Sequence, residues 1–391
     1  MITDIKIFSR QRTDGNVIGL CIDLADSIPY DCEFYYVWSD FKDNQSTIEV
    51  FDTIAYKTDV IVWVVADTFL GPHEHSWWRW KSTYGMYIIN KICKKHPYKK
   101  FILMCELYNT ELEVTATNLH VVYVGDQGTR DHKNRVLHQL YNPVKNKKPA
   151  KNWIMLNNSP STHRMSALSY VMGNGLERFG DITMSTHFQE RVGGFKEFSD
   201  MMYWELNASN AQLKLLSNGF NKIKQWKATN NEVSRTVAAQ TMETVGNFNN
   251  FLFNRYKDCF VEIIAETTFN EMPIAVTEKT LNSVYGFNFP IFMSNPWTVS
   301  YLRNLGFDMF DDVIDHTYDE IQNPAERLFA VFDNNMELLT QTDSMYKVWD
   351  DHKTRFSDNL NFARTKMIDV HRERAFQQLH KIIDKLQEES K

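Results

Sequence analysis

The sequence predicts an α/β fold in two domains, and three observations support this expectation. Short apolar runs of strand length alternate along the chain with longer segments of helical pattern. The apolar runs are continuous instead of alternating with polar residues, which is typical of parallel strands buried on both faces. The charged, proline-containing segment KNKKP, residues 145–149, interrupts the pattern and indicates a linker between the domains.

The first predicted domain, residues 1–148, contains five expected strands and one expected helix. The helix covers residues 77–96 and lies between the third and fourth strands. The expected strands are IKIFS (5–9), EFYYVW (33–38), DVIVWVVAD (59–67), KFILMCEL (100–107) and LHVVYVGD (119–126).

The second predicted domain, residues 149–362, repeats the alternation. Residues 195–256 are mostly helical in pattern, and the apolar stripe of residues 363–391 predicts a long terminal helix that packs back across the domains. We therefore expect two Rossmann-like units with a central cleft. Ligands of such sheets bind at the carboxyl ends of the strands. The remaining elements are strands at 152–156, 259–267 and 289–294, and helices at 163–172 (capped by Ser161 or Thr162), 277–287 and 323–339.

The composition is that of an ordinary globular chain. Hydrophobic residues make up 43% of the 391 residues and charged residues 24%. No apolar run approaches the ~18–20 residues that span a bilayer, and residues 1–14 lack the apolar core of a signal peptide. The five scattered cysteines indicate free thiols in a reducing compartment. We therefore expect a cytoplasmic monomer without a membrane segment.

Charge is distributed unevenly along the chain. The net charge of −6 disfavours a general nucleic-acid binder. Residues 79–100, however, hold seven basic residues and no acidic one, and residues 130–151 hold seven basic residues beside Asp131. Either these patches neutralise DNA phosphates, or they are solvated loops beside a linker. The candidate phosphate contacts are Lys94, Lys95, Lys99, Lys100, Lys147 and Lys148.

Several motifs of known chemistry are missing or misplaced. There is no G-x-x-x-x-G-K-[ST] phosphate loop, and the glycine-containing segment 173–180 follows an expected helix instead of a strand. The histidines of His73-Glu74-His75 are two residues apart and would point to different faces of a helix. We therefore expect no metal and no cofactor, and we expect side chains and helix N-termini to hold any phosphate.

Two predicted helix starts carry basic residues where the helix dipole disfavours them. His163 and Arg164 follow the loop NNSPST, and Lys279 follows Thr277 and Glu278. These residues either hold an anionic ligand or serve locally. In the local alternative Arg164 reaches a surface carboxylate, and the Glu278–Lys279 pair is a solvated helix start.

The sequence around Lys279 resembles a known family. VTEKTLNSVYGFNFPIF (276–292), with IIAET before it and YLRNLGFDMFDDVIDHTYDEI after it, is similar to the C-terminal domain of GT-B glycosyltransferases. The likeness is to the fucosyltransferase-like group and to phage glycosyltransferases that modify hydroxymethylated DNA bases. LNNSPSTHRMSAL (156–168) resembles the basic strand–loop–helix of the same group, with NNSP in place of its basic loop residues. The likeness spans residues 153–330 and does not extend to the first domain.

The resemblance implies a GT-B fold and a nucleotide-sugar donor, with a UDP-sugar favoured, in the second domain. It implies that Arg164 and Lys279 bind the diphosphate. It also implies that Glu278 meets hydroxyls of the ribose or sugar, and that Glu266 lies close to the donor. The E-x7-E pattern of many retaining enzymes is absent, since these two glutamates are twelve apart (278 − 266 = 12), which favours inversion. The predicted donor-binding residues are His163, Arg164, Glu266, Thr277, Glu278 and Lys279.

Inversion needs a general base within reach of the acceptor hydroxyl. Asp67, at the end of an expected strand, is the first candidate and Glu74, in the loop after it, is the second; a cap or turn role is the alternative for each. The phage resemblance and the basic patches favour double-stranded DNA as the acceptor, with a hydroxymethylated cytosine flipped from the duplex. The protein would then act in the cytoplasm of an infected host.

Two alternatives stay open at the level of the sequence. The acceptor is a glycan, a lipid or a small molecule, or the chain is a non-catalytic protein that binds a sugar nucleotide or nucleic acid. The sequence also does not distinguish a hexosyl-, fucosyl- or pentosyltransferase.

Overall fold

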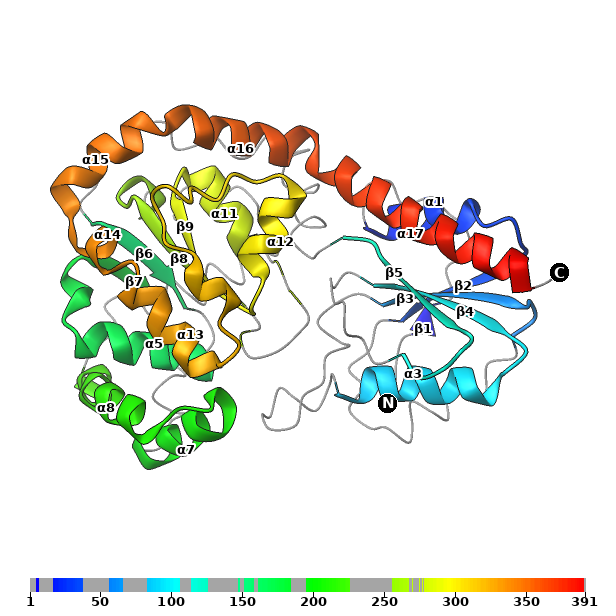
Figure 1. Cartoon of the computed structure of the whole chain (residues 1–391), viewed down its shortest axis with the longest axis horizontal. Coiled ribbons are helices and arrows are strands. Elements are labelled where there is room, and N and C mark those ends of the chain that lie inside the picture. Colours follow the sequence, from blue (N-terminus) through cyan, green and yellow to red (C-terminus); the bar gives the residue numbers. More distant parts are fainter. Residues whose placement is uncertain are drawn as a thin grey trace. The chain divides into compact units, whose positions relative to one another are not determined.

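The computed structural model shows a mixed α/β protein with two sheets of mainly parallel strands (Figure 1). Two compact units share the chain: residues 1–134, 271–275 and 365–391 form the first, and residues 135–270 and 276–364 form the second. The described residues are 5–6, 17–37, 56–65, 83–105, 114–125, 147, 151–157, 161–183, 195–225, 255–266, 269, 274, 276 and 278–389.

The sheet of the first unit has the strand order β1-β2-β3-β4-β5. Strands β2 to β5 are parallel, and β1 pairs with β2 in the antiparallel direction. Their valine, isoleucine and aromatic residues suit a pleated surface that is buried on both faces. Four strands coincide closely with the predicted segments: β2 (Cys32–Val37), β3 (Val60–Val65), β4 (Lys100–Cys105) and β5 (Leu119–Tyr123). β1 (Ile5–Lys6) corresponds to the first two residues of the predicted segment 5–9, whose other residues lie outside the described part of the chain.

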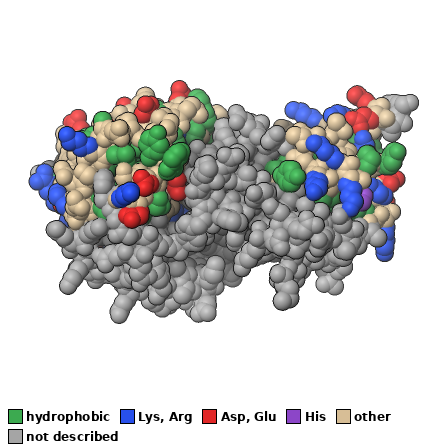
Figure 2. Space-filling view, turned by 90° about the horizontal axis from the view of Figure 1, so that it is seen from below, with side chains coloured by type: hydrophobic (Ala, Val, Ile, Leu, Met, Phe, Trp, Pro, Cys, Tyr) green, Lys and Arg blue, Asp and Glu red, His purple; other side chains and the backbone are tan. Residues whose placement is uncertain are grey.

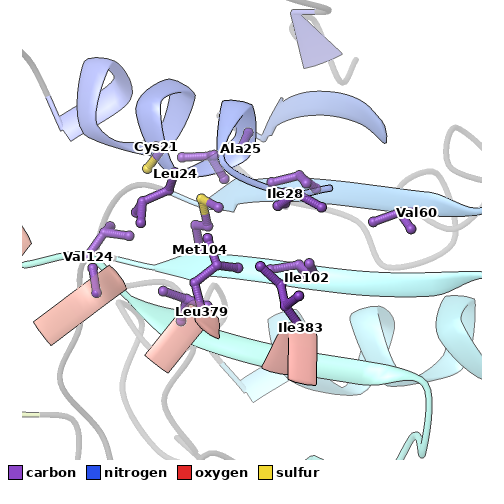
Figure 3. Packing of buried hydrophobic residues seen from close by; sticks show 14 residues of the cluster. Cys21, Leu24, Ala25, Ile28, Val60, Ile102, Met104, Val124, Leu379 and Ile383 are labelled. Carbon is purple, nitrogen blue, oxygen red and sulfur yellow. The ribbon is translucent and has the colours of Figure 1, made fainter. Parts of the chain in front are cut away.

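Alternate side chains of these strands enter two separate cores. Trp63 and Leu103 belong to the core under α3 (Thr83–Lys95). Val62 and Met104 belong to the core that α1 (Val17–Asp26) and α17 (Met367–Glu389) cover, much of which Figure 3 shows. The sequence analysis missed α1, because its short and largely apolar segment VIGLCIDLAD does not distinguish helix from strand by periodicity.

The terminal helix begins later than predicted. The expected helix from residue 363 is interrupted, since α16 (Lys353–Thr365) belongs to the second unit up to Arg364 and α17 begins at Met367 in the first. Within the first unit, α17 packs against β5, and the side chain of Gln378 accepts a hydrogen bond from the backbone N–H of Tyr123 at 3.1 Å. Its apolar stripe completes the sheet's second core.

The sheet of the second unit has the order β7-β6-β8-β9, and its strands are parallel. β6 (Trp153–Leu156), β8 (Val261–Ala265) and β9 (Phe289–Met293) lie inside predicted strands. β7 (Gly180–Thr183) was not predicted, because GDIT contains no apolar run. The chain passes from β6 to β7 on one side and then to β8 on the other, and such a reversal is a topological switch point.

Helices enclose this second sheet. α5 (Thr162–Gly173) lies so close to α8 (Asn210–Gln225) that a Cβ on Gly219 would come within 1.7 Å of the Ser169 carbonyl oxygen. Ser161 is the N-cap residue of α5, although its side chain makes no capping hydrogen bond. The predicted helix at 323–339 is divided in two. The other helical elements are η2 (Leu176–Arg178), α7 (Phe195–Leu206), α11 (Glu278–Gly286), α12 (Thr298–Leu305), η3 (Thr317–Glu320), α13 (Pro324–Asp333), α14 (Met336–Thr340) and α15 (Thr342–Asp351).

Candidate functional site

The candidate site lies at the carboxyl ends of β6 and β8, where the strand order reverses. Open α/β sheets bind ligands in the crevice outside such a switch point. Four predicted donor-site residues are described here: His163 and Arg164 in the first turn of α5, Glu266 directly after β8, and Lys279 in the first turn of α11. The structure brings these four residues, far apart in sequence, into one cluster at the end of β8.

Arg164 anchors α5 to the end of β8. Its Nη2 donates to the carbonyl oxygens of Ala265 at 2.8 Å and Glu266 at 3.0 Å, and the residue is buried. Carbonyls at a strand end have no ladder partner and need a donor when they are buried. Arg164 therefore holds the end of β8 in place beside the site. The contact with a diphosphate that the resemblance implies for Arg164 stays a prediction.

His163 is buried beside Arg164 and is neutral at physiological pH. Its Nε2 lies 3.0 Å from the carbonyl oxygen of Glu266, and its ring stacks on Phe269 with centroids 5.2 Å apart. Since a carbonyl oxygen only accepts, this nitrogen carries the proton. Burial, followed by the charge of Arg164, lowers the pKa of His163 to about 3. The imidazole would therefore meet a ligand as a neutral group, not as a cation.

Glu266 connects the end of β8 to α11. Its carboxylate is fully buried, and Oε1 accepts a hydrogen bond from Oγ1 of Thr280 at 2.9 Å. Oε2 lies 4.0 Å from Nζ of Lys279, whose side chain is 22% exposed. A buried carboxylate in this position orients the first turn of α11. The ammonium of Lys279 is thus paired with the buried carboxylate of Glu266, while part of the lysine side chain reaches solvent.

Arg327 of α13 is a site residue that the sequence analysis missed. It is buried, and its guanidinium donates to carbonyl oxygens of Ser294 (3.1 Å), Ile321 (2.5 Å) and Phe269. These carbonyls follow β9, η3 and β8, so one side chain ties three segments together at this end of the sheet. The available signal was an arginine on the apolar face of a predicted helix, close behind the cap residue Asn323.

Asn157, the residue after β6, carries an unpaired amide. It is buried, and neither its Nδ2 nor its Oδ1 has a hydrogen-bond partner in the described part of the chain. Its backbone N–H, by contrast, bonds to Thr183. Buried polar atoms are nearly always paired, and an orphaned pair calls for a water or a ligand. This amide, four residues before the N-cap of α5, went unnoticed in the sequence because an asparagine in a loop is an ordinary turn residue.

Residues 300–320, which also belong to the segment that resembles glycosyltransferases, line an acidic hollow of about 570 Å³ between α12 and η3. Its charges are largely engaged in holding the fold. Asp319 accepts from the N–H groups of Val299 (3.0 Å) and Ser300 (2.9 Å) at the start of α12. Asp311 makes a two-point ion pair with Arg303. This hollow therefore serves structure, and we do not assign it to the site.

Some predicted residues lie outside the described part of the chain. These are Asp67, Glu74, Lys148 and Thr277. Glu278 begins α11, but its side chain is not described.

The predicted phosphate contacts fall into two groups. Lys94 and Lys95 are exposed at the end of α3. Lys99 pairs with Asp59 at 3.2 Å, and Lys100 pairs with Glu389 at 2.6 Å. The first pair lies exposed at the surface, whereas each lysine of the second pair forms an ion pair with a carboxylate of the same unit.

Lys147 is a correction to the sequence analysis. It is buried in the second unit, and its ammonium donates to the carbonyl oxygens of Tyr256 (2.7 Å) and Cys259 (2.5 Å) and to Oδ1 of Asn288 (3.0 Å). Burial lowers the pKa of this ammonium to about 7. A side chain committed to three internal acceptors does not contact a phosphate at the surface, so Lys147 holds the segment before β6 to the sheet instead.

Comparisons with known proteins do not assign the chain to a family. Within the described ranges, no group of three or more His, Cys, Asp or Glu side chains is arranged to hold a metal ion. Among the same residues, no helix is both long and apolar enough to cross a bilayer. No protein-family model matches the chain, and no curated protein matches it.

Proposed function

We propose that the chain is a GT-B glycosyltransferase whose second unit binds a nucleotide-sugar, with a UDP-sugar as the first candidate. The observation that carries the proposal is the pairing of Glu266 and Lys279 at the switch point of a parallel sheet. Crevices of this kind are the usual ligand sites of open α/β sheets. The family resemblance of residues 153–330 supports the same assignment.

The groups around the crevice suit a sugar diphosphate. Lys279 supplies an ammonium for phosphate oxygens, and the first turn of α5 supplies backbone donors. That turn contains no acidic residue of its own, and the carboxylate of Glu205 beside it accepts a hydrogen bond from the hydroxyl of Thr162. The amide of Asn157 has a donor and an acceptor to spare, which matches the hydroxyls of a ribose or a sugar. Glu266 acts by positioning Lys279 and Thr280, because its carboxylate is fully buried.

The proposed reaction is an inverting transfer that needs no metal. A carboxylate of the first unit, Asp67 or Glu74, takes the proton of the acceptor hydroxyl. The hydroxyl oxygen forms a bond to the anomeric carbon as the bond to the nucleoside diphosphate breaks. The leaving diphosphate keeps the electron pair, and Lys279 stabilises its negative charge. The proposed acceptor is a hydroxymethylated cytosine in DNA.

Donor binding is tested by thermal unfolding with UDP-, GDP- and other sugar nucleotides. A ligand that binds only the folded chain raises the unfolding temperature. We expect a rise with one donor class in the wild type, a clearly smaller rise in Lys279→Met, and an unchanged rise in the control Lys347→Met, an exposed lysine of α15. Equal rises in all three proteins would remove Lys279 from the site, and no rise with any donor would end the proposal.

Catalysis is tested by release of the nucleoside diphosphate in the presence of duplex DNA containing hydroxymethylcytosine. Asp67→Ala or Glu74→Ala should abolish release while leaving the donor-induced thermal shift intact. Replacing the DNA with a glycan or a small hydroxylated acceptor distinguishes the acceptor classes. If the wild type binds a donor but releases no nucleotide with any acceptor, the chain is a binding protein and not an enzyme.

A non-catalytic nucleic-acid-binding protein is the second candidate. The exposed lysines at the end of α3 favour it, because they do not depend on the donor crevice. Binding of DNA without any donor binding would decide for this candidate.

A further inference from the structure

The outer face of α3 combines aromatic and basic side chains. We define the α3 surface as Tyr87, Lys91, Lys94, Lys95 and Tyr98. The four helical residues follow one another at helical spacing along one side of α3, and the fifth lies in the turn that follows. The side facing the sheet is buried, with Met86, Ile89, Ile92 and Cys93 in the core.

The two tyrosines of the α3 surface have little to do with the fold. Tyr98 is 92% exposed and Tyr87 is 57% exposed. Single exposed aromatic residues are common at protein surfaces, so either ring alone would mean little. Two rings on the same surface as three lysines form the combination that binds unstacked nucleic-acid bases.

The charge of the α3 surface is not neutralised by its own segment. Residues 83–100 contain five lysines and no acidic residue. Nζ of Lys94 donates to the hydroxyl of Thr115 at 2.8 Å, a partner that leaves its charge in place. The helix dipole accounts for Lys94 and Lys95 in the last turn, but it does not account for Lys91 or for the tyrosines. In the view of Figure 2, Lys and Arg side chains gather over the end of the first unit that carries α3.

We propose that the α3 surface binds single-stranded nucleic acid, with the lysines on phosphates and the tyrosines stacked on bases. A duplex stacks its bases internally and offers no faces to Tyr87 and Tyr98, whereas a single strand offers one with each base. The rings also separate this ligand from other polyanions, which would engage the lysines alone. This proposal goes beyond the proposed transfer to a duplex, because binding of a single strand needs neither a sugar donor nor an acceptor base.

The test is fluorescence anisotropy with the full chain, without a sugar nucleotide. The probes are a labelled 12-nucleotide oligodeoxythymidine, an abasic strand with the same number of phosphates, and a 12-base-pair duplex. Tyr87→Ala/Tyr98→Ala removes the rings, and Lys91→Gln/Lys94→Gln removes two charges. The matched controls are Tyr203→Ala, a 52% exposed tyrosine of the second unit, and Lys381→Gln, an exposed lysine of α17, which covers the opposite face of the first sheet.

The expected results differ for the two kinds of contact. Removing both rings should weaken oligodeoxythymidine binding by at least about tenfold and leave binding of the abasic strand unchanged. The logarithm of the wild-type affinity should fall with the logarithm of salt concentration at a slope of about −2 for three lysine–phosphate contacts, and the lysine variant should flatten it. Both controls should bind like the wild type.

Three results would overturn the proposal. They are equal affinity for the oligodeoxythymidine and the abasic strand, undiminished binding by Tyr87→Ala/Tyr98→Ala, and tighter binding of the duplex than of the single strand. Failure here leaves the donor-induced thermal shift untouched, and failure of glycosyl transfer leaves strand binding untouched, so the two proposals fail separately.

Discussion

Replacing Glu262 with glutamine should make the second unit more stable at alkaline pH and leave it unchanged at acid pH. Glu262 is the second residue of β8 and is 2% exposed. Its Oε1 accepts from the hydroxyl of Tyr256 at 2.6 Å, while Oε2 has no hydrogen-bond partner in the described part of the chain. Glutamine keeps the shape and the acceptor for Tyr256 but does not ionise.

The magnitude follows from the pKa of the buried carboxyl. Burial, with the charge of Glu266 adding to it, raises the pKa of Glu262 from its usual 4.5 to about 8, although Tyr256 and the ammonium of Lys147 act in the opposite direction. The unfolded chain therefore releases this proton near pH 4.5, and the folded chain holds it until about pH 8. Stability contributed by the neutral carboxyl is fully present below pH 4.5 and is lost as pH rises toward 8. At ~1.36 kcal/mol per pKa unit, the loss between these values is about 4 kcal/mol.

Urea unfolding followed by tryptophan fluorescence at pH 5, 6, 7 and 8 measures the effect. The stability gained by Glu262→Gln over the wild type should grow from near zero at the acid end to about 4 kcal/mol at pH 8. Glu197→Gln, which neutralises an exposed carboxylate of α7, should show no such growth. A pH-independent difference between Glu262→Gln and the wild type would refute the reasoning, and so would a variant that is less stable than the wild type at pH 8.

Three further substitutions test other parts of the second unit. Gly219→Ala should destabilise it by more than about 3 kcal/mol, because the new Cβ would lie 1.7 Å from a backbone carbonyl oxygen. In the control Gly173→Ala, in the same interface, the nearest atom to the new Cβ is 3.5 Å away, so this variant should be neutral or stabilising in thermal unfolding. Arg327→Met should lower the free energy of unfolding by about 3 kcal/mol, because it strands several buried carbonyls, whereas Arg303→Met removes an exposed pair and should change it by less than about 1 kcal/mol. Lys147→Met should reduce stability least below pH 7, where the folded chain holds the buried ammonium in its charged form, and the loss should grow as pH rises above 7, because the unfolded chain keeps the proton up to about pH 10.5; a denaturation series from pH 6 to 9 that shows a constant loss would contradict this.

Local pattern was enough to predict most strands of both sheets. Runs such as VIVWVV and FPIFM are apolar, continuous and rich in β-branched or aromatic residues, and each became a strand buried on both faces. The sequence analysis missed α1 and β7, whose segments are short or lack a clear period, and it also did not predict α12, α15 or most of α16. Helix boundaries were less predictable, because breaks such as the one between α16 and α17 have no proline or glycine to mark them.

The candidate site shows a sharper division. The sequence pointed to His163, Arg164, Glu266 and Lys279 as polar groups at strand ends and helix starts, and the structure brings them together. It did not reveal that the first two turn inward onto carbonyls of β8, because a basic residue in a first turn has the same sequence pattern whether it faces a ligand or the core.

Residue types and their spacing are local properties, so the chain alone predicted an α/β fold, its strands and a short set of candidate residues. Contacts between segments far apart in the sequence decide the strand order and the reversal between β6 and β8. They also decide the burial of Lys147, which contacts Cys259, and of Arg327, which contacts Phe269. Burial also sets the charge of His163 and Glu262, since the same side chains would titrate normally in water. Tertiary packing therefore separates Lys279, which still reaches solvent, from the buried basic residues around it.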